Sequence, residues 1–194
     1  MGHIGQVAGR RSHVAGAVVV VLALAGCGSS GAPSQETGTS EVGTTPLAVA
    51  SPDLQNGGVI PKQFTCDGAG TRPALSWAGV PAKAVEVAIL VGDPDAPGGT
   101  FMHWTMWGLP PTSRGQVGSG VLPAGVIEGA NSARRTGWTP PCPPHGDKPH
   151  HYVFGVYALR KRLSFKAGED PARVVPAVRA AAIASGSLTA SYGR

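Results

Sequence analysis

Two aspartates and a histidine stand close together in the segment DPDAPGGTFMHW, residues 93–104. Asp93 and Asp95 are two of only 11 acidic residues in the chain, and they directly follow the apolar run VEVAILVG. Asp-Pro and Pro-Gly dipeptides are common in turns, so a plain turn would account for this segment. The alternative is a pocket in which a carboxylate accepts a hydrogen bond from the ring of His103. Such a contact fixes the tautomer of a histidine and raises its pKa.

Three further histidines, His145, His150 and His151, cluster in the segment PPCPPHGDKPHHY, residues 140–152. Both segments consist of a Pro/Gly-rich loop that leads into a histidine at the start of an apolar run. Two such strands lying side by side would bring His103 and His150 together at one end of a sheet. A lone histidine in this position is more often structural than ligand-binding, so both interpretations stay open for the pair.

The elements that would position these residues are mostly β-strands. Short apolar runs alternate with turns rich in Gly, Pro and Asp, which is typical of antiparallel β structure. In HYVFGVYAL the alternation lets one face of a strand pack while the other meets solvent or a ligand. Asp170 and Pro171 could begin a C-terminal helix, but Pro176 restricts the predicted helix to Ala177–Ser185. The predicted strands are Leu47–Ala50, Ala74–Trp77, Val85–Gly92, Met102–Leu109, Val121–Ile127, Tyr152–Leu159 and Leu188–Tyr192.

The first 26 residues are interpreted as a lipoprotein signal peptide. Arg10 and Arg11 precede an apolar stretch, residues 14–26, that is too short to span a bilayer comfortably. The sequence LAGC resembles the bacterial lipobox, which implies cleavage before Cys27, diacylation of Cys27 and attachment to the membrane. A plain secretory signal with an incidental cysteine is the alternative. Residues 27–46 are rich in Gly, Ser and Thr, which predicts a flexible, lipid-anchored tether.

The net charge limits the classes of partner, and the cysteine count bears on whether the domain contains a disulfide. Removing residues 1–26 takes away two of the 16 basic residues and none of the 11 acidic residues, which leaves a net charge of +3. This mild charge gives no indication of nucleic-acid binding. If Cys27 is lipidated, Cys66 and Cys142 are the only two cysteines left to pair in an oxidising environment, so we expect a disulfide, with two free buried thiols as the alternative. In the chain-entropy model, a bridge that closes a loop of about 76 residues stabilises the folded domain by about 4 kcal/mol.

Three sequence blocks in order resemble the phosphatidylethanolamine-binding protein family, the Raf-kinase-inhibitor-like proteins, and specifically its bacterial branch. The similarity extends over residues 47–194, and the ending SLTASYGR is similar to the final strand of the family. The three blocks are FTCDGAGTRPALSWAGVP (64–81), DPDAPGGTFMHWTMWGLP (93–110) and PPCPPHGDKPHHYVFGVYAL (140–159).

The resemblance implies a mostly β fold, an antiparallel β-sandwich with a short C-terminal helix, and a pocket for phosphate or phosphorylated headgroups. The sequence departs from the family pattern at His151, where relatives have arginine, at Ser132–Arg134 and at Trp138, and these changes bear on the pocket rim. Carried over residue by residue, the ligand-binding set is Asp93, Asp95, Pro97, His103, Pro144, Gly146, His150 and Tyr152.

The resulting interpretation is a lipid-anchored protein on the extracytoplasmic face of the cell membrane that binds small anions, with a possible regulatory role. Its expected partners are a phosphorylated small molecule, the membrane through Cys27, and a possible protein partner. An inhibitor of an exported protease or another protein is one alternative. A metal-dependent hydrolase that uses the two aspartates and two histidines is another, but the ligand spacing is loose and no nucleophile motif is present. We therefore expect no enzyme activity, no cofactor and no metal.

Overall fold

The computed structural model describes residue 2 and residues 45–194. The predicted signal peptide (1–26), Cys27 and the predicted tether up to residue 44 lie outside the described residues. The described elements, in chain order, are β1 (Thr45–Pro46), β2 (Ala48–Ala50), the 3-10 helix η1 (Lys62–Phe64), β3 (Leu75–Ala78), β4 (Glu86–Asp93), β5 (Phe101–Leu109), β6 (Arg114–Val117), β7 (Ile127–Glu128), β8 (His150–Leu159), α1 (Pro171–Ala181) and β9 (Ala182–Tyr192).

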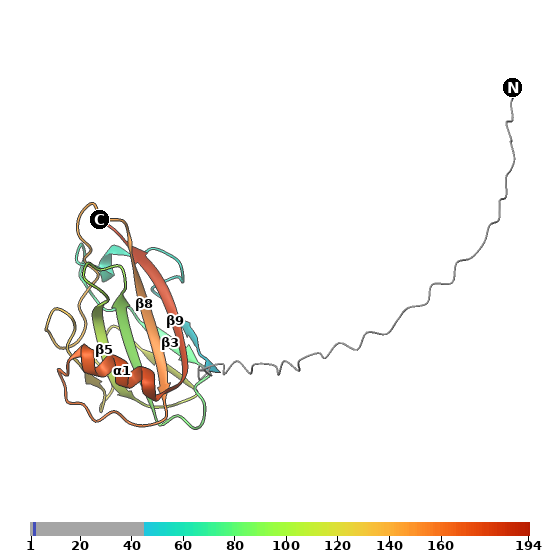
Figure 1. Ribbon diagram of the computed structural model, residues 1–194, viewed down its shortest axis with the longest axis vertical. Helices are drawn as coiled ribbons and strands as arrows, with labels where there is room; N and C mark the ends of the chain where they lie inside the picture. The colour runs from blue at the N-terminus through green and yellow to red at the C-terminus, as the bar shows by residue number, and fades with distance from the viewer. Residues whose placement is uncertain (1, 3–44) are drawn as a thin grey trace, which may run out of the picture. The chain divides into compact units, whose positions relative to one another are not determined.

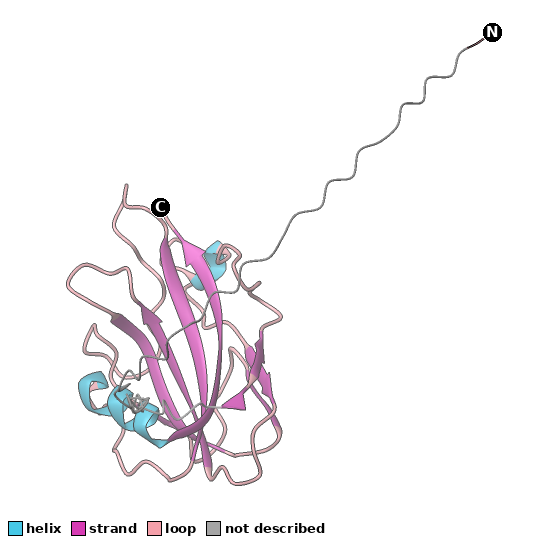
Figure 2. Ribbon diagram, turned by 45° about the vertical axis from the view of Figure 1, so that its right-hand side comes forward, coloured by secondary structure: helices cyan, strands magenta, loops and turns pink. Residues whose placement is uncertain are grey.

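Two sheets and one helix form three layers. The large sheet has the strand order β1-β9-β8-β4-β5-β7, and the small sheet has the order β2-β3-β6. All pairings between these strands are antiparallel except that of β1 with β9. The small sheet lies on one side of the large sheet, and α1 lies on the other (Figures 1 and 2). The predicted β-sandwich with a short C-terminal helix is confirmed.

The two faces of the large sheet pack into separate hydrophobic clusters. On β8, Tyr152, Phe154 and Val156 point into the cluster shared with the small sheet, whereas Tyr157 packs with the cluster under α1. Both faces are therefore covered along much of the strand, and all eight residues of β4 are buried. The expectation that one face of β8 would meet solvent holds at the start of the strand, where His151 is exposed, whereas α1 covers the outer face further along.

The predicted strand Val121–Ile127 is mostly absent, and the observed strand β6 was not among the predicted strands. Residues 121–126 form no strand, and the pairing with β5 begins only at Ile127, because Pro123 lacks a backbone donor and Gly125 adopts a φ of +85°. The polar strand β6 was not predicted, since RGQV lacks an alternating apolar pattern.

The helix α1 occupies Pro171–Ala181 rather than Ala177–Ser185. As expected, Asp170 caps it, because its carboxylate accepts a hydrogen bond from the Ala172 backbone N–H at 2.8 Å. The residues from Ala182 onward pair with β8, so cross-strand hydrogen bonds override the helix propensity of this alanine-rich segment.

The segment from residue 45 onward contains its own core and its own cross-link. Every residue in both hydrophobic clusters lies between Leu47 and Tyr192. The predicted disulfide between Cys66 and Cys142 is confirmed, with the two Cα atoms 5.4 Å apart. Because the sheets, the core and the disulfide are all completed within residues 45–194, this segment has what it needs to fold as an independent unit.

Candidate functional site

Three neighbouring strands position the candidate site at one end of the large sheet. The expected arrangement, with the strands of His103 and His150 side by side, is wrong, because β4 lies between β5 and β8. Since β4 runs antiparallel to both neighbours, its last residue, Asp93, lies beside the first residues of each. This strand order places a carboxylate between the two histidines.

An irregularity in the β4–β5 pairing sets the position of His103. Val91 pairs with Trp104 and Gly92 pairs with Met102, so His103 has no partner residue on β4. Such a bulge reorients a side chain relative to the regular ladder. The ring of His103 is buried, and its Nδ1 lies 2.9 Å from the backbone oxygen of Thr139. A carbonyl oxygen only accepts hydrogen bonds, so Nδ1 carries the proton and Nε2 is left for another partner.

His150 is held by the carboxylate of Asp93. The Nδ1 of His150 donates to Asp93 Oδ2 at 2.7 Å, and only 5% of His150 and 3% of Asp93 are exposed. The other oxygen of Asp93 accepts the backbone N–H of Asp95 at 2.9 Å. Asp147, whose carboxylate is nearly half exposed, lies 3.8 Å from the Nε2 of His150, which is beyond hydrogen-bond distance. Both buried histidines therefore use Nδ1 in a hydrogen bond, whereas their Nε2 atoms make no hydrogen bond to the described residues.

Tyr152 completes the group of polar side chains. Its ring lies edge-on to His103, with 5.2 Å between the ring centroids. The residue is fully buried, and its hydroxyl has no hydrogen-bond partner among the described residues. Burial, together with the nearby carboxylates of Asp93 and Asp95, raises the pKa of this hydroxyl above its usual range, so it remains protonated and able to donate.

These side chains line one cavity of about 270 Å³, which we call the Asp/His cavity. Of the eight predicted ligand-binding residues, six line it: Asp93, Pro97, His103, Pro144, His150 and Tyr152. Three further lining residues, Pro140, Cys142 and Pro143, fall within the second histidine segment, so their position in the sequence was an available signal. Phe101 belongs to the first segment in the same way, whereas nothing in the sequence pointed to Thr139. The full lining is Asp93, Ala96, Pro97, Phe101, His103, Thr139, Pro140, Cys142, Pro143, Pro144, His150 and Tyr152.

Asp95 and Gly146 are not among the lining residues. Asp95 accepts hydrogen bonds from the backbone N–H and from the Nδ1 of His151, at 2.7 and 2.8 Å. His151 is exposed because successive residues of β8 point to opposite faces of the sheet. The backbone N–H of Gly146 donates to the carbonyl of Arg194, so it is not free for a ligand. The two aspartates thus contact different histidines, one in the cavity and one outside it.

Burial decides the charge of His103. Removal from water disfavours the imidazolium form and lowers the pKa of His103 below the ordinary 6.5. The hydrogen bond to Thr139 and the carboxylate of Asp93 act in the opposite direction, and His150 adds to the lowering. At neutral pH the ring is therefore neutral, with Nε2 as a hydrogen-bond acceptor.

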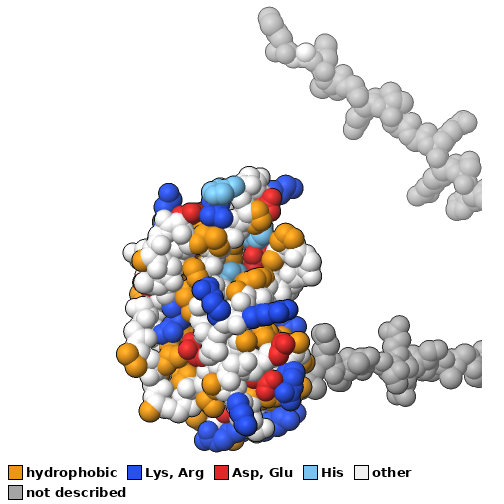
Figure 3. All heavy atoms as spheres, turned by 90° about the vertical axis from the view of Figure 1, so that its left-hand side faces the viewer, with side chains coloured by type: hydrophobic (Ala, Val, Ile, Leu, Met, Phe, Trp, Pro, Cys, Tyr) orange, Lys and Arg blue, Asp and Glu red, His pale blue; other side chains and the backbone are white. Residues whose placement is uncertain are grey.

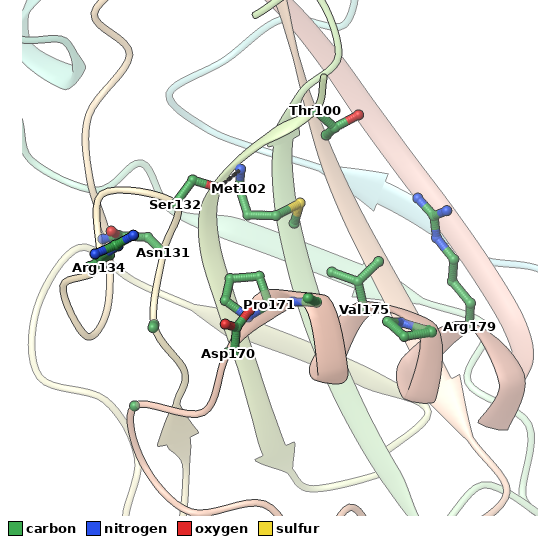
Figure 4. A pocket seen from close by; sticks show the side chains of 13 residues that line it. Thr100, Met102, Asn131, Ser132, Arg134, Asp170, Pro171, Val175 and Arg179 are labelled. Carbon is green, nitrogen blue, oxygen red and sulfur yellow. Dashed lines mark hydrogen bonds between the residues drawn. The ribbon is translucent and has the colours of Figure 1, made fainter. Parts of the chain in front are cut away.

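The departures at residues 132–134 lie at a second, larger cavity and not at the rim of the Asp/His cavity. This cavity of about 690 Å³ lies between α1 and the loop that contains Asn131, Ser132 and Arg134. Its two cations, Arg134 and Arg179, are exposed and lie on opposite sides of it (Figure 4). Two exposed cations that do not converge form a weaker ligand site than the buried polar groups of the Asp/His cavity.

Asn131 and Trp138 have structural partners. The amide oxygen of Asn131 accepts the backbone N–H groups of Ala133 and Arg135, and its amide nitrogen donates to the Gly137 carbonyl. Trp138 donates to the carbonyl of Gly70 at 3.0 Å. These hydrogen bonds hold the loop that leads into Thr139, the hydrogen-bond acceptor of His103.

A family model for the phosphatidylethanolamine-binding protein matches residues 50–193 of the chain. The chain belongs to the phosphatidylethanolamine-binding protein family. A protein of Mycobacterium tuberculosis (strain ATCC 25618 / H37Rv) named "Putative lipoprotein LppC" is 38% identical to this family member over 187 residues, which cover 90% of this chain and 92% of LppC.

Solved structures of the family agree with the fold described above. The crystal structure of Escherichia coli YbcL superposes with a TM-score of 0.72 at 32% identity, covering 76% of this chain and 98% of YbcL. The structure of CT736 from Chlamydia trachomatis D/UW-3/CX gives a TM-score of 0.70 at 31% identity, covering 78% of this chain and 99% of CT736. The resemblance inferred from the sequence blocks is confirmed.

The described part of this family member contains neither a cluster of metal ligands nor a membrane-spanning helix. Within residues 45–194, no three His, Cys, Asp or Glu side chains lie close enough together to hold a metal ion. In the same segment, no helix is both long and apolar enough to cross a membrane.

Proposed function

We propose that this protein binds small anions, such as phosphate or phosphorylated headgroups, in the Asp/His cavity. The observation that carries the proposal is the Tyr152 hydroxyl, which is buried and unpaired. A buried hydroxyl without a partner costs roughly 1–3 kcal/mol, and a ligand oxygen in the cavity would remove that cost. The Nε2 atoms of His103 and His150 supply further polar contacts in the same cavity.

The protonation pattern favours an anion that still carries one proton. Because both Nδ1 atoms donate to fixed acceptors, a neutral ring offers the ligand only a lone pair at Nε2. A phosphate monoanion can donate its O–H to one Nε2 and accept from Tyr152. A protonated His150 would supply a charge-assisted donor instead, worth about 1.5–3 kcal/mol. In either case the complex contains a proton, so affinity rises as the pH falls.

The size of the cavity also suits a small ligand. A volume of about 270 Å³ lies just below the range of about 300–1,000 Å³ typical of sites for drug-sized molecules. Phosphate with a short substituent fits this space better than a diacylated lipid. We propose binding rather than catalysis as the function of the cavity.

The similarity to LppC supports the proposed location. The alignment covers 90% of the chain, so it extends well beyond the domain that the structure describes. We propose that the mature protein is anchored through a diacylated Cys27 on the outer face of the cytoplasmic membrane. Substituting Cys27→Ala in the full chain should block processing or release the protein, as followed by mass spectrometry and detergent partitioning. Wild-type protein found unlipidated in the medium would contradict the anchor.

The binding proposal is tested by calorimetry on residues 45–194 with phosphate, phosphoethanolamine and sulfate, each with and without a chelator. We expect phosphate and phosphoethanolamine to bind and the chelator to have no effect. Sulfate, which carries no proton at neutral pH, should bind more weakly than phosphate. Loss of binding in chelator would indicate a metal site, and no heat with any anion would refute the proposal.

A further inference from the structure

The end of the domain opposite the Asp/His cavity carries a dense group of basic side chains. The segment from Arg160 to Lys166 contains four basic residues in seven and no acidic one. Residues 79–85, which lead into β4 at the same end, add Lys83 and no acidic residue. We use the term basic end for the surface formed by Lys83, Arg160, Lys161 and Arg162.

Strand pairing brings these side chains together. The backbone N–H of Val85 donates to the carbonyl of Leu159 at 2.9 Å, which places the loop with Lys83 beside the end of β8. Arg160 donates its backbone N–H to Ala181 at the end of α1. All four side chains are exposed, and Lys and Arg side chains gather at the lower end of the domain in Figure 3.

Residues 79–86 and 159–166, which meet at the basic end, contain a single acidic residue, Glu86, and its carboxylate is buried. Glu86 is 2% exposed, and one of its oxygens accepts the backbone N–H of Leu163 at 3.3 Å. Lys83 and Lys161 have no hydrogen-bond or ion-pair partner among the described residues. Their charges therefore remain available to an external anionic surface.

The chain also enters the described domain at this end. Thr45 pairs with Ala184, which is the third residue of β9, and Leu159 at the end of β8 pairs with Ala182, the first residue. Cys27, the proposed site of lipidation, stands 18 residues before Thr45, and 18 residues reach about 60 Å at most. A lipid on Cys27 would thus keep the basic end within reach of the bilayer.

We infer that the basic end docks on a membrane surface that contains anionic phospholipids, and that docking directs the Asp/His cavity toward the solution. The membrane orientation rests on the proposed lipid anchor, whereas the charged surface does not. His150 and Leu159 are the two ends of β8, a strand of ten residues, so the cavity lies about 30 Å from the basic end. The ligand would accordingly be a soluble phosphorylated molecule rather than a headgroup within the same bilayer.

The test uses residues 45–194, which lack Cys27, so a failed anchor cannot affect the result. Binding is measured by co-sedimentation with vesicles of phosphatidylcholine alone and of phosphatidylcholine mixed with phosphatidylglycerol. We expect binding to the mixed vesicles only, and weaker binding as salt increases, because salt screens exposed charges.

Two double variants with equal net charge separate the basic end from overall charge. Lys83→Gln with Lys161→Gln should weaken partitioning about fivefold for each lysine, since one basic residue near an anionic bilayer contributes about 1 kcal/mol. Lys62→Gln with Lys148→Gln removes two exposed lysines from the cavity end and should have little effect. Thermal unfolding checks that both variants fold.

Three outcomes would overturn the inference. They are equal weakening by the two double variants, equal binding to both kinds of vesicle, and no binding to either kind. Binding to polyglutamate but not to the mixed vesicles would assign the basic end to an acidic protein partner instead.

Discussion

Asp93 Oδ2 accepts a hydrogen bond from His150 Nδ1 at 2.7 Å, although the two residues are 57 positions apart in the chain. They meet because β4 ends where the antiparallel strand β8 begins. The contact holds the imidazole in one orientation, with Nδ1 facing the carboxylate and Nε2 without a hydrogen bond. The carboxylate of Asp93 lies beside the proposed anion site, and its role in that proposal is to orient a histidine that would contact the ligand.

This role predicts opposite effects for two carboxylates near His150. Asp93→Asn should weaken phosphate binding several-fold, because it replaces a charge-assisted hydrogen bond by a weaker one and releases the ring. Asp147→Asn should strengthen binding, because Asp147 makes no hydrogen bond to the ring and places a negative charge 3.8 Å from the Nε2 that would contact the anion. Calorimetry on both variants measures the difference. Tighter binding by Asp93→Asn would show that repulsion dominates at both positions.

The histidines themselves should contribute at least one charge-assisted hydrogen bond. We expect His103→Ala and His150→Ala each to weaken phosphate binding by at least about tenfold, which corresponds to about 1.4 kcal/mol. Wild-type affinity should rise from about pH 8 to about pH 6, because the complex holds a proton on the phosphate or on a ring. His151→Ala, which changes an exposed histidine outside the cavity, is the control. Affinity that is independent of pH would contradict the proton requirement.

Tyr152→Phe should separate binding from stability. The hydroxyl has no partner in the described residues, so its removal should leave the free energy of unfolding unchanged or slightly higher. Phosphate binding should weaken about three- to tenfold through the loss of one donor. Tyr157→Phe, on the opposite face of β8, is the matched control. A large loss of stability in Tyr152→Phe would mean that the hydroxyl has a structural partner.

His103 should make the ligand-free protein sensitive to acid. Its pKa is lowered in the folded state, mainly by burial, relative to about 6.5 in the unfolded chain. Between these two pKa values the unfolded chain binds more protons, so the free energy of unfolding falls as the pH drops below about 6.5. Urea titrations of wild type and His103→Gln across this interval should show a smaller loss in the variant. An equal loss would place the acid sensitivity elsewhere.

The disulfide should stabilise the domain substantially. Cys66 and Cys142 are 76 positions apart, and a bridge across such a loop contributes about 4 kcal/mol in the chain-entropy model. The double variant Cys66→Ala with Cys142→Ala should therefore unfold at a markedly lower urea concentration than wild type. Thiol titration of the unfolded, unreduced domain should detect no free thiol. Two reactive thiols in protein isolated without reductant would contradict the bridge.

Local sequence patterns were sufficient for several features of this protein. Alternating apolar runs between turns predicted β4, β5 and β8, because side chains of a strand alternate between two faces. Asp170 next to Pro171 predicted the start of α1, and the cysteine count pointed to the disulfide. The Pro/Gly loops before His103 and His150 placed both histidines at the starts of strands.

Only the tertiary structure decided how these parts meet. The position of β4 between β5 and β8 depends on long-range pairing, which no local pattern encodes, and it brings Asp93 to His150. The register shift at His103 has the same origin, as does the end of α1 at Ala181, where pairing with β8 outweighs helix propensity. The separation of Asp93 from Asp95 likewise follows from the hydrogen bonds each makes to a different histidine of β8. The sequence determines which residue types are present, and the strand order determines which of them line the same cavity.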